Sequence, residues 1–220
     1  MEHGNKRMKP AELFSLLHKS FGPQGWWPAS TKFEVAVGAI LTQQTSWKNV
    51  EKAIHELKRQ KLLTPKTLAR TKPTALESCI RPTGFYKQKA KRVRLLAQEF
   101  PRIKESAKKL ELTEFRAELL ELDGVGKETA DSILLYAFNL PILPVDAYTR
   151  RITQRAYGFD GDYEELRLFY ESRLPRDPKV LNEFHALLVE LAKRHCTKKE
   201  PNCPSCQLKM ACKSAGNKLK

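Results

Sequence analysis

The stretch Leu122-Asp123-Gly124-Val125-Gly126-Lys127 lies between a leucine-rich segment, residues 115–122, and a predicted helix at residues 127–138. Two glycines around one apolar residue permit a tight turn between two helices, with Val125 pointing inward. Such a turn exposes backbone N–H groups at the positive end of the second helix, where a phosphate oxygen can bind without any base-specific contact. A glycine-capped helix hairpin with a purely structural role explains the same residues equally well.

Apolar residues recur at helical spacing on both sides of this stretch. Between Phe33 and Leu41 they stand at positions i, i+4, i+7 and i+8, which places them on one face of a helix. A helical spacing of i, i+3, i+4 and i+7 recurs in segments 50–57, 130–137 and 184–191, and prolines and glycines lie between the segments. No segment shows the sustained alternation of a strand, so the sequence predicts an all-α protein.

The composition is that of a folded domain. The chain has 220 residues, of which 41% are hydrophobic and 30% are charged, which excludes a disordered tail and is enough for a core. The longest apolar stretch, residues 35–41, is far too short to span a membrane. The N-terminus lacks the apolar segment of a secretion signal, so we expect a cytoplasmic protein without membrane contact.

The charge balance points to a polyanionic partner. Forty Lys and Arg against 25 Asp and Glu give a formal net charge of +15 and an isoelectric point near 9.7. Basic clusters at 58–61, 87–94 and 193–199 alternate with apolar residues, as on helices with basic outer faces. A folded domain this basic often binds nucleic acid. Charge that only maintains solubility is the alternative, since net charge by itself specifies no partner.

Four of the five cysteines lie near the C-terminus, with the spacing Cys196-x6-Cys203-x2-Cys206-x5-Cys212. Nothing in the sequence indicates an oxidising compartment, which disfavours two disulfides. Closely packed thiolates repel one another unless a bound cation neutralises them. Zinc sites usually contain two short C-x2-C pairs, whereas one pair between two wider loops favours an iron–sulfur cluster over zinc. Cys79 lies in an apolar context and is predicted to be a core residue.

Together these features resemble the helix–hairpin–helix DNA glycosylases of the endonuclease III superfamily. In that family a Gly-Val-Gly turn, a Val-Asp pair and a four-cysteine tail follow one another in this order. Here they are Gly124-Val125-Gly126, Val145-Asp146 and the four C-terminal cysteines. The resemblance extends from about Phe33 to Cys212.

The resemblance implies two helical domains that flank a DNA-binding cleft. One is a six-helix barrel at residues 31–140, with the helix–hairpin–helix motif at about 112–138. The other joins residues 1–30 to 141–220 and carries the cluster loop at 196–212. The implied cofactor is a [4Fe–4S] cluster on the four cysteines. The implied partner is double-stranded DNA with damaged bases, and the damaged base is rotated out of the duplex into the cleft.

Asp146 takes the place of the family's catalytic aspartate. A fixed carboxylate can stabilise the positive charge that develops on the sugar as an N-glycosidic bond breaks, and it can orient or deprotonate water. Asp146 also stands where it can N-cap the following helix, and the two roles can coexist. Members that cut the DNA strand carry a lysine where this sequence has Glu128, which cannot form an imine. The neighbouring Lys127 points about 100° away on a helix. The resemblance therefore implies a monofunctional glycosylase, with weak or no AP lyase activity.

The tryptophans bear on the base that is released. Trp26 and Trp27 lie in a predicted loop, and Trp47 is the third tryptophan of the chain. Stacked aromatic rings favour an electron-poor, cationic base, such as a purine alkylated at N3 or N7. Packing of the two domains against each other is the alternative role for these rings.

One branch of the superfamily, the class III 3-methyladenine DNA glycosylases, is similar at the stretches 26–34, 38–43, 81–86, 126–128 and 184–193. That similarity implies a base sandwiched between Trp47 and one of Trp26 or Trp27, with Glu128 and Lys193 as further pocket residues. Gln43 and Phe85 fall where the superfamily places side chains that enter the base stack. One would fill the gap left by the base and the other would probe the opposite strand. The residues implied to contact the DNA backbone are Gly124, Val125, Gly126 and Lys127.

The combined interpretation is a monomeric, nucleoid-associated DNA glycosylase of base excision repair. It flips alkylated purines of the 3-methyladenine type out of DNA and hydrolyses their N-glycosidic bond. A glycosylase for mismatched or deaminated bases is the first alternative, since stacking pockets are permissive. A non-catalytic, zinc-containing DNA-binding protein is the second.

Overall fold

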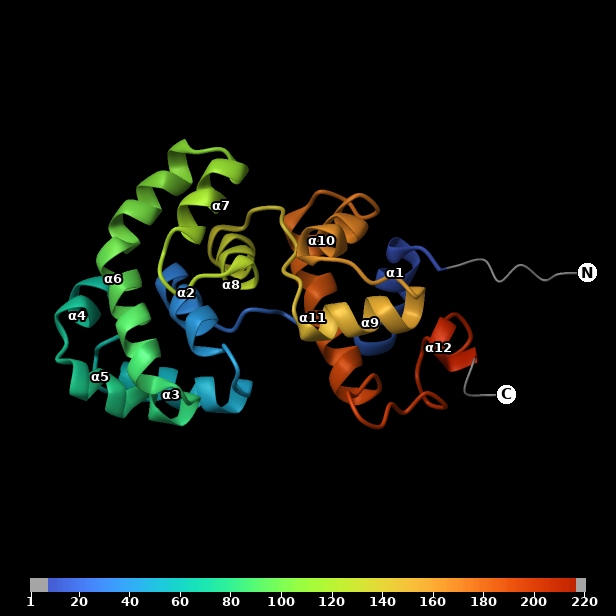
Figure 1. Cartoon of the computed structure of the whole chain (residues 1–220), viewed down its shortest axis with the longest axis horizontal. Coiled ribbons are helices and arrows are strands. Elements are labelled where there is room, and N and C mark those ends of the chain that lie inside the picture. Colours follow the sequence, from blue (N-terminus) through green and yellow to red (C-terminus); the bar gives the residue numbers. More distant parts are fainter. Residues whose placement is uncertain (1–7, 217–220) are drawn as a thin grey trace, which may run out of the picture. The chain divides into compact units, whose positions relative to one another are not determined.

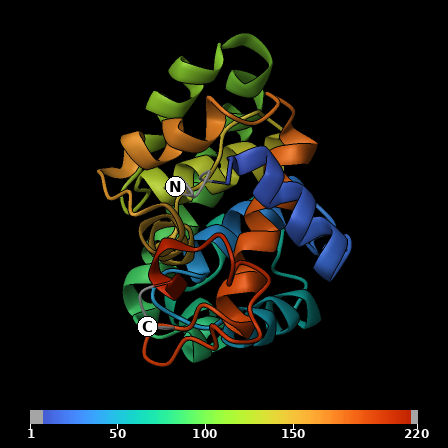
Figure 2. The same cartoon turned by 90° about the vertical axis from the view of Figure 1, so that its right-hand side faces the viewer.

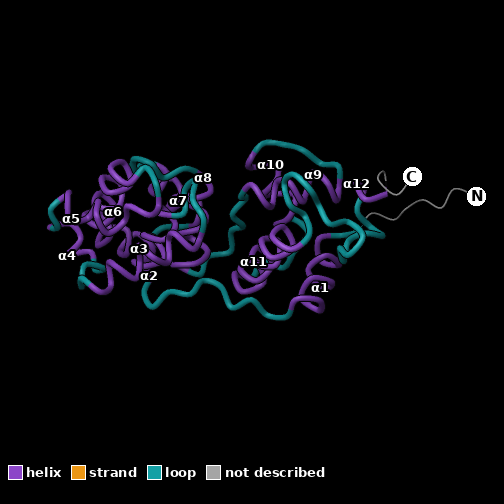
Figure 3. Tube along the Cα trace, turned by 90° about the horizontal axis from the view of Figure 1, so that it is seen from below, coloured by secondary structure: helices purple, strands orange, loops and turns teal. Residues whose placement is uncertain are grey.

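The computed structural model describes residues 8–216, which form helices joined by loops and contain no strand (Figures 1 and 3). The all-α prediction is confirmed. The chain divides into two compact units. The central unit is Trp27–Leu140, and the terminal unit joins the described residues up to Trp26 with those from Pro141 onward. Within residues 8–216, no helix combines the length and hydrophobicity that crossing a bilayer requires.

The central unit is built around a buried helix. Its elements are α2 (Lys32–Leu41), α3 (Trp47–Arg59), α4 (Pro65–Arg70), α5 (Pro73–Ile80), a 3₁₀ turn (Arg81–Thr83), α6 (Tyr86–Lys109), α7 (Leu112–Leu120), α8 (Lys127–Ser132) and a π-helical segment (Ile133–Ala137). Every residue of α2 from Phe33 to Leu41 is buried, because α2 packs against α3, α6, α8 and the π-helical segment. Cys79 is buried in α5, as predicted.

Helix α6 supplies the long wall of the central unit. It runs for 24 residues, and its apolar face is buried against α2, α4 and α5, while its basic residues mostly face outward. Phe100 on this face meets Phe33 of α2 edge to face, with ring centroids 4.9 Å apart. The predicted helix at 127–138 is present, although its second half continues as the π-helical segment.

The terminal unit surrounds α11 (Figures 1 and 2). Its helices are α1 (Pro10–Phe21), α9 (Ala147–Tyr157), α10 (Tyr163–Glu171), α11 (Pro178–Arg194) and α12 (Lys213–Gly216). α11 packs against α1 and α9, and Phe184 at its centre contacts the ring of Tyr170, with centroids 5.2 Å apart. The loop that carries the four C-terminal cysteines connects α11 to α12.

Candidate active site

Asp146 is the N-cap of α9. Its backbone is extended, and its Oδ1 accepts a hydrogen bond from the backbone N–H of Thr149 at 2.7 Å. The loop before it is fixed by two further bonds: Leu143 N–H donates to Glu171 Oε1 (2.7 Å) and Val145 N–H donates to Tyr163 Oη (3.2 Å). The predicted capping role is therefore confirmed. One carboxylate oxygen is occupied by the cap, and the second faces another side chain.

That side chain is His185 of α11, whose Nε2 lies 3.7 Å from Asp146 Oδ2. His185 is buried, and burial lowers its pKa, although the nearby Asp146 carboxylate opposes this effect. The imidazole is therefore neutral at neutral pH and lies beside the carboxylate without a direct hydrogen bond to it. The sequence analysis did not assign His185 a role. Its position next to Phe184, on the buried face of α11, is the signal that could have identified it.

Trp26 and Lys193 belong to the same group of residues in the terminal unit. The ring of Trp26 meets the His185 ring edge to face, with centroids 6.4 Å apart. Lys193 Nζ lies 5.6 Å from the centroid of the Trp26 ring, a cation–π distance. The terminal unit thus brings together Asp146, His185, Trp26 and Lys193, which come from a loop, the α9 N-cap and α11.

Trp27 and Trp47 form a separate aromatic group in the central unit. Their rings meet edge to face with centroids 5.0 Å apart, and Trp27 also contacts Tyr136 at 5.0 Å. Gly38 makes room for this ring, since a Cβ there would lie 3.2 Å from the Trp27 indole. A cavity of about 220 Å³ borders the pair and is also lined by Glu34, Glu51, His55 and Lys58. The adjacent tryptophans of the sequence therefore have different neighbours: Trp26 contacts His185, and Trp27 contacts Trp47.

The Gly-Val-Gly turn has the conformation that the sequence predicts. Gly124 has a φ of +78°, which few other residues adopt, and Val125 is buried. Gly126 is the N-cap of α8, where Lys127 and Glu128 form the exposed first turn. The turn therefore presents backbone N–H groups and a lysine at the start of a helix, as a phosphate-binding turn requires.

Gln43 and Phe85, which are predicted to enter the base stack of the DNA, differ in their surroundings. Phe85 is 64% exposed and has a left-handed backbone, with a φ of +46°. An exposed aromatic ring on a strained backbone is unusual in a folded protein. It suits a side chain that enters a base stack. Gln43 is half-buried, and its amide donates to Gly124 O (2.8 Å) and Thr129 Oγ1 (3.0 Å). The structure thus holds Gln43 against the hairpin and leaves Phe85 projecting.

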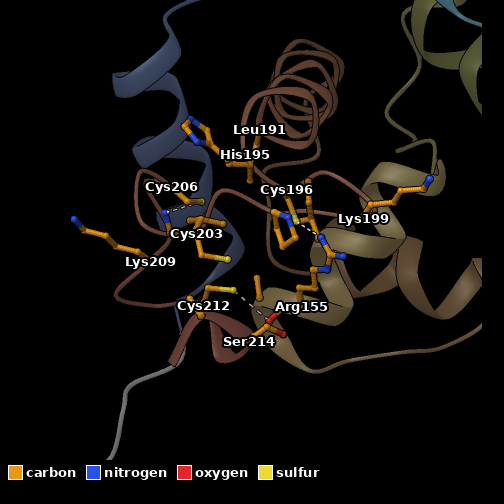
Figure 4. Close-up of a pocket in the computed structure, with 15 residues that line it drawn as sticks. Arg155, Leu191, His195, Cys196, Lys199, Cys203, Cys206, Lys209, Cys212 and Ser214 are labelled. Carbon is orange, nitrogen blue, oxygen red and sulfur yellow. Dashed lines mark hydrogen bonds between the residues drawn. The ribbon is translucent and has the colours of Figure 1, made fainter. Parts of the chain in front are cut away.

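The four C-terminal cysteines line one cavity of about 210 Å³ in the terminal unit (Figure 4). Two N–H groups point to their sulfurs: Leu208 N–H donates to Cys206 Sγ and Arg155 Nη1 donates to Cys196 Sγ, each at 3.4 Å. Burial raises the pKa of the Cys206 thiol, and the neighbouring cysteines raise it further. The thiolate form of Cys206 therefore needs a compensating cation.

The four thiols are donors that both zinc and iron–sulfur clusters use. Within residues 8–216, no three His, Cys, Asp or Glu side chains lie close enough together to hold one metal ion. Zinc requires all four sulfurs within about 2.3 Å of one point. A cuboidal iron–sulfur cluster takes one cysteine on each iron, so its ligands stand farther apart around a larger space. Four cysteines around a cavity fit the second description.

Comparison with known proteins agrees with this geometry. Residues 37–176 match the model of the HhH-GPD superfamily base excision DNA repair proteins. A candidate DNA repair glycosylase of Methanocaldococcus jannaschii is 44% identical over 210 residues, covering 92% of this chain and 95% of that protein. Endonuclease III of Thermotoga maritima is 33% identical over 186 residues, covering 82% of each chain.

A solved structure is similar over most of its length. The 3-methyladenine DNA glycosylase of H. pylori, bound to 1,N6-ethenoadenine, superposes with a TM-score of 0.74 at 29% identity. The match covers 85% of this chain and 98% of that one. The chain belongs to the HhH-GPD superfamily of base excision DNA repair proteins, the helix–hairpin–helix DNA glycosylases.

Proposed function

We propose that this DNA glycosylase is monofunctional and removes alkylated purines of the 3-methyladenine type from double-stranded DNA. The observation that carries the proposal is the group formed by Asp146, His185 and Trp26 in the terminal unit. It combines a fixed carboxylate, a neutral imidazole and an aromatic face. The similarity to a 3-methyladenine DNA glycosylase supports the same substrate class.

In the proposed reaction Asp146 acts through its Oδ2, because the helix cap occupies Oδ1. As the bond between C1′ and the base nitrogen breaks, its electron pair leaves with the base and positive charge develops on the sugar. The Asp146 carboxylate stabilises that charge. Water then adds to C1′ and gives its proton to Asp146, which returns it to solvent. His185 fixes the position of the carboxylate and keeps this side of the site free of bulk water.

The charge of the leaving base explains the proposed substrate class. A purine methylated at N3 or N7 is cationic, so it departs as a neutral molecule and needs no proton from a general acid. An aromatic face such as that of Trp47 binds such a base through the ring quadrupole. Glu128, in the first turn of α8 after the Gly-Val-Gly turn, adds a negative charge that attracts a cationic base. A neutral uracil or hypoxanthine gains less from each of these features.

The substrate assignment is tested by measuring the bases released from duplexes that carry 3-methyladenine, hypoxanthine or uracil. We expect fastest release of 3-methyladenine. Trp47→Ala should lower that rate about 5- to 150-fold, equivalent to about 1–3 kcal/mol of stacking. Trp47→Phe keeps a stacking face and is the matched control with a milder loss. Equal release of all three bases would favour the mismatch- or deaminated-base alternative.

The identity of residue 128 supports a monofunctional enzyme. A lyase needs an amine that forms an imine with the sugar, and Glu128 offers a carboxylate at that position. We therefore expect no covalent adduct when the protein is mixed with damaged DNA and borohydride. Glu128→Lys should introduce a trapped adduct if the position is the one that faces the sugar. An efficient adduct with the wild-type chain would contradict the assignment.

The four C-terminal cysteines are proposed to hold a [4Fe–4S] cluster. Cys196, Cys203, Cys206 and Cys212 would each hold one iron, and the N–H groups of Leu208 and Arg155 would stabilise the negative sulfurs. The bound cluster would neutralise the thiolates and give the loop a fixed shape. Iron and sulfide analysis with visible absorption tests the proposal. A colourless protein with stoichiometric zinc would refute it.

A further inference from the structure

Lys89 of α6 is a buried lysine whose contacts join two separate segments of the central unit. Its side chain is among the largest that are almost fully buried, with a relative exposure of 2%. Its Nζ donates to Leu41 O and to Thr83 O, each at 2.8 Å. Burial lowers its pKa to about 8, with a smaller contribution from the positive charge of Arg92. At neutral pH the buried ammonium is therefore still largely charged.

The two carbonyl groups belong to the last residues of two helical segments. Leu41 is the last residue of α2 and Thr83 is the last residue of the 3₁₀ turn. Helix C-terminal carbonyls lack intrahelical partners and carry partial negative charge, so a cation there satisfies both ends at once. An apolar side chain would fill the space at a lower desolvation cost, but it would leave both carbonyl groups without this donor.

In both segments, a residue that is predicted to contact DNA lies two positions after the carbonyl group that Lys89 binds. Gln43 follows Leu41 by two positions, and Phe85 follows Thr83 by two positions. The backbone turns into the left-handed region at Gln44 (φ +53°) in one segment and at Phe85 (φ +46°) in the other. One ammonium group thus holds the C-terminal end of α2 and that of the 3₁₀ turn in place.

Arg92 extends this connection to the hairpin. It lies one turn beyond Lys89 on α6, and its Nη1 donates to Gln43 Oε1 at 2.9 Å. Its side chain also crosses Gly124 closely, since a Cβ there would lie 2.0 Å from Arg92 Nε. Gln43 is in turn bonded to Gly124 and Thr129 of the hairpin region. α6 is therefore hydrogen-bonded to two segments that are expected to contact DNA, and it packs against the third, the hairpin turn, through Arg92.

We propose that Lys89 and Arg92 are positioning residues for lesion recognition, which hold Gln43, Phe85 and the hairpin turn at fixed separations so that they engage the duplex together. The proposal rests on the DNA-contacting roles of Gln43 and Phe85 within the proposed function. Neither basic residue needs to touch DNA for it. Their effect is on discrimination of a damaged site from an intact duplex, because non-specific affinity comes from the exposed basic residues.

The test compares two duplexes of one sequence. One is intact, and the other carries a tetrahydrofuran abasic analogue opposite 2-aminopurine, whose fluorescence rises when a side chain unstacks it. We expect Lys89→Met to leave intact-duplex affinity within about twofold and to weaken abasic-duplex affinity about 10- to 100-fold, as a displacement of about 1 Å can do. The fluorescence rise should be lost as well. Lys104→Met, the same change at an exposed position of α6, is the matched control.

A double-mutant cycle separates positioning from general destabilisation. If Lys89 acts by placing Phe85, Lys89→Met should add little to the loss caused by Phe85→Ala. Full additivity, wild-type discrimination in Lys89→Met, or equal weakening on both duplexes would overturn the proposal. If circular dichroism shows that Lys89→Met is unfolded, Arg92→Met decides in the same assay, and unchanged discrimination there refutes the proposal.

The probe contains no alkylated base, so the result does not depend on the substrate assignment. A wild-type protein that recognises the abasic duplex but releases no 3-methyladenine would refute the proposed substrate and leave this inference testable. A wild-type protein that does not distinguish the two duplexes would refute the inference.

Discussion

At the scale of single residues, Asp146 caps a helix and is also the proposed catalytic group, and each role uses a different carboxylate oxygen. Oδ1 caps α9 through Thr149 N–H, and Oδ2 faces His185. The helix N-terminus stabilises the negative charge of the carboxylate, and the bonded loop before it limits its movement. A capping residue therefore becomes a preorganised electrostatic group.

Replacing Asp146 should separate these two roles. Asp146→Asn keeps an oxygen that can cap α9 but removes the charge, so we expect little change in thermal stability and a fall in excision of about 100- to 1,000-fold. Single-turnover excision and DNA affinity are the measurements. Asp160→Asn, the same change at an exposed carboxylate, is the control. Full excision activity in Asp146→Asn would exclude Asp146 as the catalytic carboxylate.

His185 predicts a particular dependence of stability on pH. Its folded-state pKa lies below the ordinary value of 6.5, mainly because the ring is buried. As the pH falls below about 6.5, His185 binds a proton in the unfolded chain before it does so in the folded protein. The free energy of unfolding must therefore decrease. We expect His185→Gln to lose less stability than wild type between neutral and mildly acidic pH. Thermal unfolding curves across this range test it, and parallel curves for the two proteins would show that His185 titrates normally.

At the scale of elements, the hairpin and α6 form one packed assembly. Gly124 has a left-handed backbone and lies directly under Arg92, whereas Gly126 has a φ of −88° and open space where its Cβ would be. The two glycines of one motif therefore meet different requirements. The first permits the turn and the contact with α6, and the second begins α8.

This difference gives a matched pair of variants. Gly124→Ala should lower the free energy of unfolding by about 1–2 kcal/mol from the left-handed backbone alone, and by more if Arg92 cannot move. Gly126→Ala should have a much smaller effect on stability, because its conformation suits any residue. Urea unfolding of both variants is the measurement. Equal losses would show that the contact with Arg92 and the backbone conformation do not matter.

At the scale of the whole molecule, the formal charge of +15 is carried by a chain that folds as two compact units. Only one of these units holds the cysteine loop. Within the described part of that loop, residues 196–212, Leu208 is the buried apolar side chain, so apolar burial contributes little to its stability. The proposed cluster must supply the remainder.

Loss of the cluster should therefore affect the two units unequally. Cys206→Ser should lose iron and increase amide hydrogen exchange in the loop and at the C-terminal end of α9, which contacts it through Arg155. Exchange in α2 of the central unit should stay as in wild type. Cys79→Ala removes a thiol outside the loop and should retain the iron. Unchanged exchange in the loop of Cys206→Ser would show that it folds without a metal group.

The sequence by itself determined the secondary structure and the motifs. Helical periodicity, the Gly-Val-Gly turn and the N-cap at Asp146 depend on neighbours within a few residues, and all three are present in the structure. Burial of Cys79 followed from its apolar context in the same way. Even Lys89 could have been found, since it stands at helical spacing with Val93, Leu96 and Phe100 on the buried face of α6.

The tertiary structure decided which of these residues meet. The pairing of His185 with Asp146, the different neighbours of Trp26 and Trp27, and the bond of Lys89 to Leu41 O each join segments that are distant in sequence. Local spacing fixes the face of a helix on which a side chain lies. The partner on the opposing helix depends on how the helices pack, because burial and hydrogen bonding are satisfied only when both segments are in place.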